Sequence, residues 1–306
     1  MDVYLPPEAV PLTPEMEGYR ARVMDCTARP EELDELYTLH VGPAIVGHIR
    51  PEFARRLEEF SDVFDVRSKD ASVVMSRELR TPEERTKAMA GVLRELRSQG
   101  VITGWRDELY PVVEAFHQTP LMLVERAAVP YLGVRAYGVH INGYTVSEEG
   151  EVKMWVARRS KTKQTWPSKL DHIVAGGQPV GISCADNVIK ECQEEASIPE
   201  PLARKAKPCG AVSYVCMQLA GLKRDVLFVY DLELPADFKP KPEDGEVEEF
   251  MLWPIPKVAE VIQTTTEFKP NCALVVIDFL IRHGYIKPDE PGYLDLFTGL
   301  RIGHCA

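Results

Sequence analysis

The chain has 306 residues, enough for two hydrophobic cores, and its 45% hydrophobic and 27% charged residues are ordinary for a folded protein. Its 36 lysines and arginines against 47 aspartates and glutamates give a net charge of −11, which argues against nucleic acid as the main partner because an acidic chain repels phosphate backbones. A small phosphorylated substrate stays open, since bound metal ions can invert the local charge.

The N-terminal residues show no targeting pattern. Met1 to Thr13 holds Asp2, Glu8 and three prolines but no arginine, which is typical of neither a signal peptide nor an arginine-rich transit peptide. The seven cysteines include no C-x-x-C pair and favour a reducing compartment. We therefore expect a cytoplasmic protein in which residues 1–20 form a flexible tail.

Residues 21–125 predict a small α+β domain. Thr81-Pro82-Glu83-Glu84 combines an N-cap, a proline at the first helical position and a capping-box glutamate, and Gly100 closes the helix that follows. The other elements predicted here are strands within 36–49 around a turn at Gly42-Pro43, a short helix over 51–60 and one or two strands over 63–74.

Residues 126–306 predict a second, larger domain. Its predicted elements are a strand hairpin over 133–147 and 151–160, a strand at 172–174, a helix at about 184–197, strands at 211–217, 226–232 and 250–253, and helices at 256–263 and 271–283. This order describes an α/β sandwich with a mixed sheet. The longest apolar run, Ala273 to Ile281, is interrupted by Asp278 and is too short to span a bilayer, so we expect no membrane partner.

The stretch Gly176 to Ile198, GGQPVGISCADNVIKECQEEASI, is the most informative one. On its helix, Glu191, Glu194 and Glu195 stand at i, i+3 and i+4, so their side chains converge on one face. Three like charges so close destabilise an isolated helix, and a hard divalent cation with oxygen ligands removes that conflict. The alternative is a solvated acidic face, which is the commoner origin of such a run.

The same stretch resembles the Nudix box, G-x5-E-x7-R-E-U-x-E-E-x-G-U, in which U is a bulky aliphatic residue. KECQEEASI (190–198) lies over R-E-U-x-E-E-x-G-U. The resemblance implies that Glu191, Glu194 and Glu195 bind metal, that Glu194 or Glu195 orients the attacking water, and that Gly176 and Gly177 form the loop before the helix.

Three positions depart from the box. Lys190 replaces the arginine and Ser197 replaces the late glycine. The distance from Gly177 to Lys190 is one residue short, so Ile182 and Ser183 stand where the early glutamate belongs. A lysine cannot form the bidentate fork of arginine, which leaves the glutamates less firmly held.

A wider resemblance covers nearly the whole chain. Segments 104–112, 152–183, 223–240, 244–255 and 284–296 resemble the thiamine-pyrophosphokinase-related Nudix subfamily. That resemblance implies a Nudix α/β/α sandwich preceded by a small α+β domain. It further implies an Mg²⁺-dependent hydrolase, with Mn²⁺ as an alternative metal. The implied substrate is thiamine diphosphate and, preferentially, its oxidised or damaged forms; a homodimer is left open.

Basic and aromatic residues just before the glycine loop are candidates for substrate contacts. Arg159, Lys163 and Lys169 can clamp a phosphate, or they can form a solvated hairpin end. Trp166, with Tyr214, can wall a heteroaromatic ring, although a tryptophan beside a proline more often packs structurally.

One further glutamate and two histidines are the remaining candidates for site residues. Glu246 is a candidate extra acid/base, against a solvated loop glutamate as the alternative. No two histidines pair at metal-ligand spacing in the sequence, and we expect His140 and His172 to be satisfied structural residues.

Three functions therefore compete. The first is hydrolysis of thiamine-type diphosphates, and the second is hydrolysis of nucleoside diphosphate derivatives such as ADP-ribose. The third is a non-catalytic Nudix module that binds a ligand. The three helical glutamates count against the third, because a binding module has no need of crowded carboxylates.

Overall fold

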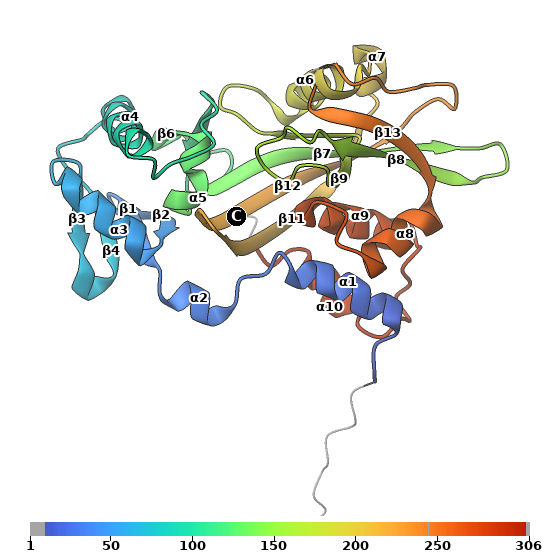
Figure 1. Ribbon diagram of the computed structural model, residues 1–306, viewed down its shortest axis with the longest axis horizontal. Coiled ribbons are helices and arrows are strands. Elements are labelled where there is room, and N and C mark those ends of the chain that lie inside the picture. Colours follow the sequence, from blue (N-terminus) through green and yellow to red (C-terminus); the bar gives the residue numbers. More distant parts are fainter. Residues whose placement is uncertain (1–9, 244, 304–306) are drawn as a thin grey trace, which may run out of the picture.

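The computed structural model describes residues 10–243 and 245–303, and the predicted tail over residues 1–9 lies outside them. The chain forms a central seven-stranded sheet with helices on both faces, and a smaller four-stranded sheet stands beside it (Figure 1).

The smaller sheet comes from the N-terminal part of the chain and has the strand order β2-β1-β4-β3. Helix α4 beside it begins as predicted: Thr81 Oγ1 accepts the Glu84 N–H at 3.2 Å, and the Glu84 carboxylate accepts the Thr81 N–H at 3.0 Å. The elements are β1 (Tyr37–Val41), β2 (Ala44–Ile49), α3 (Pro51–Leu57), β3 (Phe64–Arg67), β4 (Ser72–Met75) and α4 (Pro82–Ser98).

A short two-stranded sheet and a one-turn helix join this part to the central sheet. They are β5 (Leu109–Val112), β6 (Met122–Glu125) and α5 (Val129–Leu132). The hydrophobic core around the small sheet continues through α5 to Ala136. A division of the chain between residues 125 and 126 therefore stays a prediction.

The central sheet has the order β11-β12-β7-β8-β13, with β10 beside β7 and β9 beside β8. β7 and β12 run parallel and the other pairs run antiparallel, so the sheet is mixed as predicted. Its strands are β7 (Arg135–Val146), β8 (Val152–Arg159), β9 (Leu170–His172), β10 (Val174–Gly177), β11 (Lys207–Gln218), β12 (Gly221–Glu233) and β13 (Val247–Pro254).

Helices cover both faces of this sheet, which confirms the predicted α/β/α sandwich (Figure 1). One face carries α6 (Cys184–Ala196) and α7 (Glu200–Ala203), and the other carries α1 (Pro14–Met24), α8 (Ile255–Thr264), α9 (Pro270–Arg282) and α10 (Tyr293–Gly299). A short helix, α2 (Pro30–Asp34), lies between α1 and the small sheet.

Helix α1 corrects the predicted flexible tail. It begins at Pro14, and its buried residues Met16, Tyr19 and Val23 join the core formed with α8 and α9. The sequence suggested a tail because this helix has only a narrow apolar stripe. Burial of that stripe stabilises the helix only when the C-terminal helices cover it.

Helix α9 is buried on nearly every side, and its charged residues are held by partners. Asp278 pairs with Arg282 at 2.7 Å, and Arg282 reaches Asp231 of β12 at 2.6 Å. His283 Nε2 lies 2.8 Å from the same Asp231 carboxylate. In the described parts of the chain, no helix combines the length and hydropathy needed to cross a membrane.

We expect Asp231→Asn to destabilise the fold by about 2–4 kcal/mol at neutral pH, because it removes one of the two carboxylates that pair with the largely buried Arg282 and leaves only Asp278. Burial raises the pKa of Asp231, but hydrogen bonds from His283, Arg282 and Asn142 hold it below its usual value. The stabilisation is thus present above the unfolded pKa of about 4 and is lost as pH falls further.

Urea unfolding of wild type and variant between pH 3 and pH 7 measures this difference. The exposed Glu233→Gln on the same strand is the control and should shift stability by less than about 0.5 kcal/mol. A pH-independent difference, or equal stability of Asp231→Asn and wild type, would contradict the assignment.

Candidate active site

The acidic helix α6 is held at both ends by its own residues. Ser183 Oγ accepts the Asp186 N–H at 3.1 Å and caps the start, as predicted. Ser197 ends the helix with φ of 53°, a left-handed conformation that favours glycine. The late glycine of the box pattern thus corresponds to a position that needs a left-handed backbone, and Ser197 adopts that conformation. Its hydroxyl donates to the Lys241 carbonyl oxygen at 3.0 Å.

Two of the helical glutamates reach strand β10, which contains Gly176 and Gly177; the predicted loop before the helix therefore begins only after Gly177, because both glycines pair with β7. Glu195 Oε2 accepts the Ala175 N–H at 2.9 Å. Glu191 lies so close to Gly176 that a Cβ added to the glycine would sit 2.2 Å from Glu191 Cδ. The glycine at position 176 therefore makes room for the carboxylate.

Glu194 is exposed, whereas Glu191 and Glu195 are half-buried. Lys190 Nζ lies 2.8 Å from Glu194 Oε2 and 3.1 Å from Glu191 Oε1, so one lysine contacts both carboxylates. The bidentate fork of an arginine is absent, but the positive charge that it would supply stays in place.

The electrostatics of this group fit a divalent cation. Burial raises the pKa of Glu191, and it raises the pKa of Glu195 well above its usual value, with the Glu191 charge adding to the effect. Two carboxylates that are costly to ionise side by side become favourable when they share a hard cation. Their oxygen-only donor set suits Mg²⁺ or Mn²⁺.

A cleft of about 900 Å³ opens beside the glycine loop, between the central sheet and the N-terminal part of the chain. Gly176 and Gly177 form part of its wall, so the α6 glutamates adjoin it across β10 without lining it. Although the protein is acidic, the charged residues of the described lining are five basic ones and one acidic one: Arg97, Arg106, Arg126, Lys223, Lys269 and Asp225.

Two of these cations interact electrostatically with the glutamates, Arg126 with Glu191 and Lys269 with Glu195, and sequence reasoning missed both. Arg126 Cζ lies 3.7 Å from the position that a Cβ on Gly177 would take, and Glu108 holds its Nη1 at 2.8 Å. Lys269 Nζ lies 3.7 Å from an Asp171 carboxylate oxygen. Burial is the largest influence and lowers the pKa of Lys269, but the Asp171 charge and smaller contributions that include Glu195 together raise it above its usual value, so the amine stays charged.

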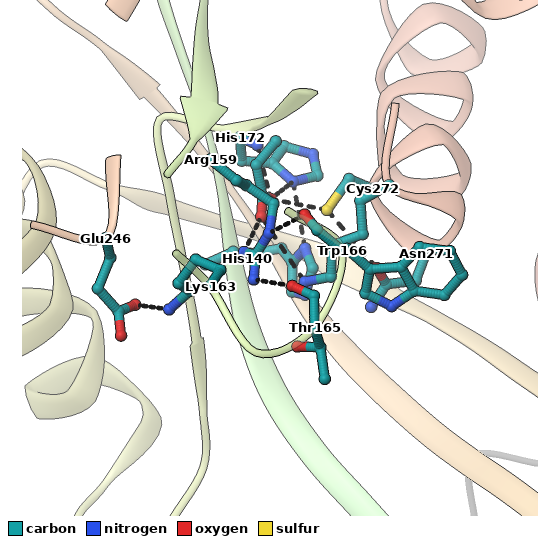
Figure 2. Close-up of polar contacts among 12 residues, drawn as sticks. His140, Arg159, Lys163, Thr165, Trp166, His172, Glu246, Asn271 and Cys272 are labelled. Carbon is teal, nitrogen blue, oxygen red and sulfur yellow. Dashed lines mark hydrogen bonds and ion pairs between the residues drawn. The ribbon is translucent and has the colours of Figure 1, made fainter. Parts of the chain in front are cut away.

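Arg159 has a different role from the predicted phosphate contact. Its guanidinium pairs with Asp171 at 2.7 Å. It also donates to the carbonyls of Thr165 and Trp166, at 2.9 and 3.0 Å; Figure 2 shows Arg159 beside these two residues. With its donors turned into the protein, Arg159 holds the loop between β8 and β9 in place. Sequence shows a charge but not its partners, and a phosphate contact by Arg159 stays a prediction.

The other predicted contacts are also engaged elsewhere. Lys163 and Glu246, predicted as separate site residues, form an ion pair with each other (Figure 2). Burial raises the pKa of Glu246, but the hydrogen bond and charge of Lys163, together with the charges of Arg159 and Arg126, hold it below its usual value, so the carboxylate is ionised at neutral pH. Lys169 donates to the carbonyl of Thr266 and does not line the cleft.

The aromatic wall of the cleft comes from residues that the sequence did not single out. Trp166 lies outside the described lining, and Tyr214 is buried with its hydroxyl on Asp225 at 2.7 Å. Trp105 and Tyr131, both from the N-terminal part of the chain, line the cleft instead. Their contribution depends on packing between distant segments, which no local pattern reveals.

His140 and His172, expected to be separate structural residues, lie side by side although they are 32 positions apart in the sequence. His140 Nδ1 and His172 Nδ1 are 3.2 Å apart, and Cys272 lies with them so that one ligand atom of each is within 4.8 Å of the others (Figure 2). His172 Nε2 is buried without a partner among the described residues, so this ring is not fully satisfied. Burial and His172 hold the pKa of His140 well below its usual value.

Comparisons with known proteins cover most of the chain. Residues 19–136 match a family model described as a domain of unknown function (DUF4743). The chain is 46% identical over 299 residues to "Nudix hydrolase 20, chloroplastic" of Arabidopsis thaliana, covering 95% of this chain and 80% of that protein. It is 45% identical over 303 residues to "Nudix hydrolase 24, chloroplastic" of the same plant, covering 99% and 82%.

The names of these two relatives overturn the expectation of a cytoplasmic protein, since both are called chloroplastic. That expectation relied on cysteine usage and on the composition of the first residues, neither of which identifies an organelle.

Solved structures also resemble the chain. A MutT protein from Methanosarcina mazei aligns with a TM-score of 0.36 and 21% identity, covering 49% of this chain and 94% of the other. The NUDIX domain of Shewanella oneidensis NrtR, complexed with ADP ribose, aligns with a TM-score of 0.40 and 12% identity, covering 49% and 89%.

Proposed function

Because the chain belongs to the Nudix hydrolase family, we propose that it hydrolyses a phosphoanhydride bond of a small-molecule diphosphate, with a divalent cation held by Glu191, Glu194 and Glu195. The proposed substrates are thiamine diphosphate and its oxidised or damaged derivatives, and the products are the monophosphate and phosphate. Mg²⁺ is the proposed metal, and Mn²⁺ is an alternative.

The observation that carries the proposal is the junction at Gly176. On one side of this glycine stand the half-buried carboxylates of Glu191 and Glu195, and on the other lies a cleft rich in basic side chains. A diphosphate lying at the junction would meet oxygen ligands shared through a cation and positive side chains at once.

Each group at the junction has a separate task in this proposal. The bound metal supplies charge neutralisation and a water of lowered pKa. Glu195, fixed by the Ala175 N–H, orients that water. Arg126 and Lys269 bind the phosphate oxygens and balance the charge that develops on them.

The Glu246 carboxylate is a second candidate for accepting a proton. It lies outside the described cleft lining, and Lys163 keeps it ionised. We therefore assign it a supporting role and place the main proton transfer at Glu195.

The organic end of the substrate would lie toward Trp105 and Tyr131, because these aromatic residues line the same cleft as the basic ones. Flat rings stack on such side chains. The preference for thiamine compounds over other ring diphosphates draws its support from the sequence resemblance across residues 104–296.

Initial rates on a panel of diphosphates test the substrate proposal. We expect oxidised thiamine diphosphates to be cleaved to monophosphates with a higher kcat/KM than ADP-ribose or nucleoside triphosphates, and chelation of Mg²⁺ to stop all turnover. Turnover of ADP-ribose without turnover of any thiamine diphosphate would replace this substrate class with nucleoside diphosphate derivatives. No turnover of any member would favour a ligand-binding module.

A further inference from the structure

The floor of the cleft contains a buried acid among its basic residues. Asp225 of β12 is 7% exposed and lines the cleft. Its Oδ2 is 2.7 Å from the Tyr214 hydroxyl and 3.0 Å from Lys223 Nζ. Its Oδ1 is buried and has no hydrogen-bond partner among the described residues.

An unpartnered carboxylate oxygen is unfavourable in a buried position, and it strongly favours an N–H or O–H donor. Oδ2 is held from two sides, which fixes the orientation of the carboxylate and leaves Oδ1 as its unpartnered oxygen among the described residues. Tyr214 and Lys223 both contact Oδ2, so neither of them satisfies the hydrogen-bonding capacity of Oδ1.

The position of Asp225 suits the far end of a ligand whose diphosphate lies at the glycine loop. Gly177 pairs with Gly138 of β7, while Asp225 pairs with Ala136 two residues further along. The two residues are therefore two strand spacings apart across the sheet and two residues apart along the strand direction. This places Gly177 and Asp225 roughly 12 Å from each other. A diphosphate ester of a small ring system spans a distance of this order.

Two aromatic residues of the same cleft lining, Trp105 and Tyr131, are held by their own neighbours. Trp105 is fixed by an indole N–H to Asp107 Oδ1 hydrogen bond of 2.8 Å, and the Arg97 guanidinium lies 4.7 Å from its ring centre. Tyr131 is steadied by Phe53, with ring centres 5.3 Å apart. Aromatic residues held in this way offer preformed surfaces for stacking.

We propose that Asp225 is a specificity-determining residue whose Oδ1 accepts an N–H from an aminated heteroaromatic ring at the organic end of the diphosphate substrate. This inference rests on the proposed function for the placement of the diphosphate. It adds the chemical group that the cleft selects at the opposite end.

The test pairs a change in the protein with a change in the substrate. Thiamine diphosphate is compared with the analogue that lacks the amino group of the pyrimidine ring, using wild type and Asp225→Asn. For wild type we expect loss of the amine to lower kcat/KM by about 10-fold or more. For Asp225→Asn we expect the two substrates to differ by less than about 3-fold, because an amide is a weaker acceptor than a carboxylate.

Tyr214→Phe is the matched control, because it removes one partner of Oδ2 while Lys223 still holds that oxygen at 3.0 Å and Oδ1 is unchanged. It should retain the wild-type ratio between the two substrates even if both rates fall. An equal fall on both substrates in Asp225→Asn, with the wild-type ratio kept, would overturn the proposal and leave Asp225 a structural role.

Calorimetric binding of the same two compounds, with Ca²⁺ in place of Mg²⁺, separates this inference from the proposed function. Amine-dependent binding without turnover supports the role of Asp225 while the hydrolase proposal fails. Turnover without amine dependence supports the hydrolase and overturns the role of Asp225. Absence of both binding and turnover overturns the two together.

Discussion

Glu195→Gln is expected to lower kcat by about 10²- to 10⁴-fold while the protein stays folded. The amide keeps the size of the side chain, but it carries no negative charge to hold a cation and cannot accept the proton of the attacking water. Burial raises the pKa of Glu195 well above its usual value, so its charge is a cost to the metal-free fold. The metal-free variant should therefore be at least as stable as the metal-free wild type.

Two measurements on the same samples check this expectation. Steady-state rates give kcat, and thermal unfolding with and without Mg²⁺ gives the stabilisation by metal, which should be present in wild type and reduced in the variant. Glu200→Gln on the neighbouring α7 is the control, because Glu200 is exposed and pairs only with Arg204 in the described contacts. Wild-type turnover by Glu195→Gln would remove this residue from the chemistry.

Gly176→Ala is expected to lower kcat on the order of 100-fold with little change in stability. The new Cβ would lie 2.2 Å from Glu191 Cδ, so the carboxylate must move away from β10. A glutamate terminus can move cheaply, which spares the fold. The displacement nevertheless separates Glu191 from Glu195 and breaks up the ligand set for the cation.

The matched control is Gly91→Ala in α4, where no atom lies within 4 Å of the added Cβ. That change should leave kcat untouched and stabilise the helix by up to about 1 kcal/mol. Comparison of kcat and urea midpoints for the two variants gives the result. Full activity of Gly176→Ala, or its failure to fold, would show that the glycine has another role.

Local signals predicted the correct elements wherever a helix or strand carries its own pattern. The capping box at Thr81 and the apolar stripe of α6 are such cases, and both are present in the structure. Helix α1 lacked such a signal, since its stability comes from covering α8 and α9. Its apolar residues make sense only after the C-terminal helices are placed.

The candidate site divides along the same line. The three glutamates and the two glycines lie within residues 176–195, so a motif could identify them. Arg126, Lys269 and Asp225 come from three distant segments, and only the folded sheet brings them to one cleft. Arg159 and Lys163 illustrate the converse, because charges adjacent in sequence to the site are paired with Asp171 and Glu246.

A competition reaction followed by ³¹P NMR tests the central claim most directly. Wild-type protein, Mg²⁺ and equal concentrations of an oxidised thiamine diphosphate and ADP-ribose are placed in one sample, so both substrates meet the same enzyme. The account predicts that the thiamine compound disappears first, giving its monophosphate and inorganic phosphate, and that neither substrate reacts once Mg²⁺ is chelated. Consumption of ADP-ribose while the thiamine compound stays intact, or cleavage that continues without a divalent cation, would contradict it.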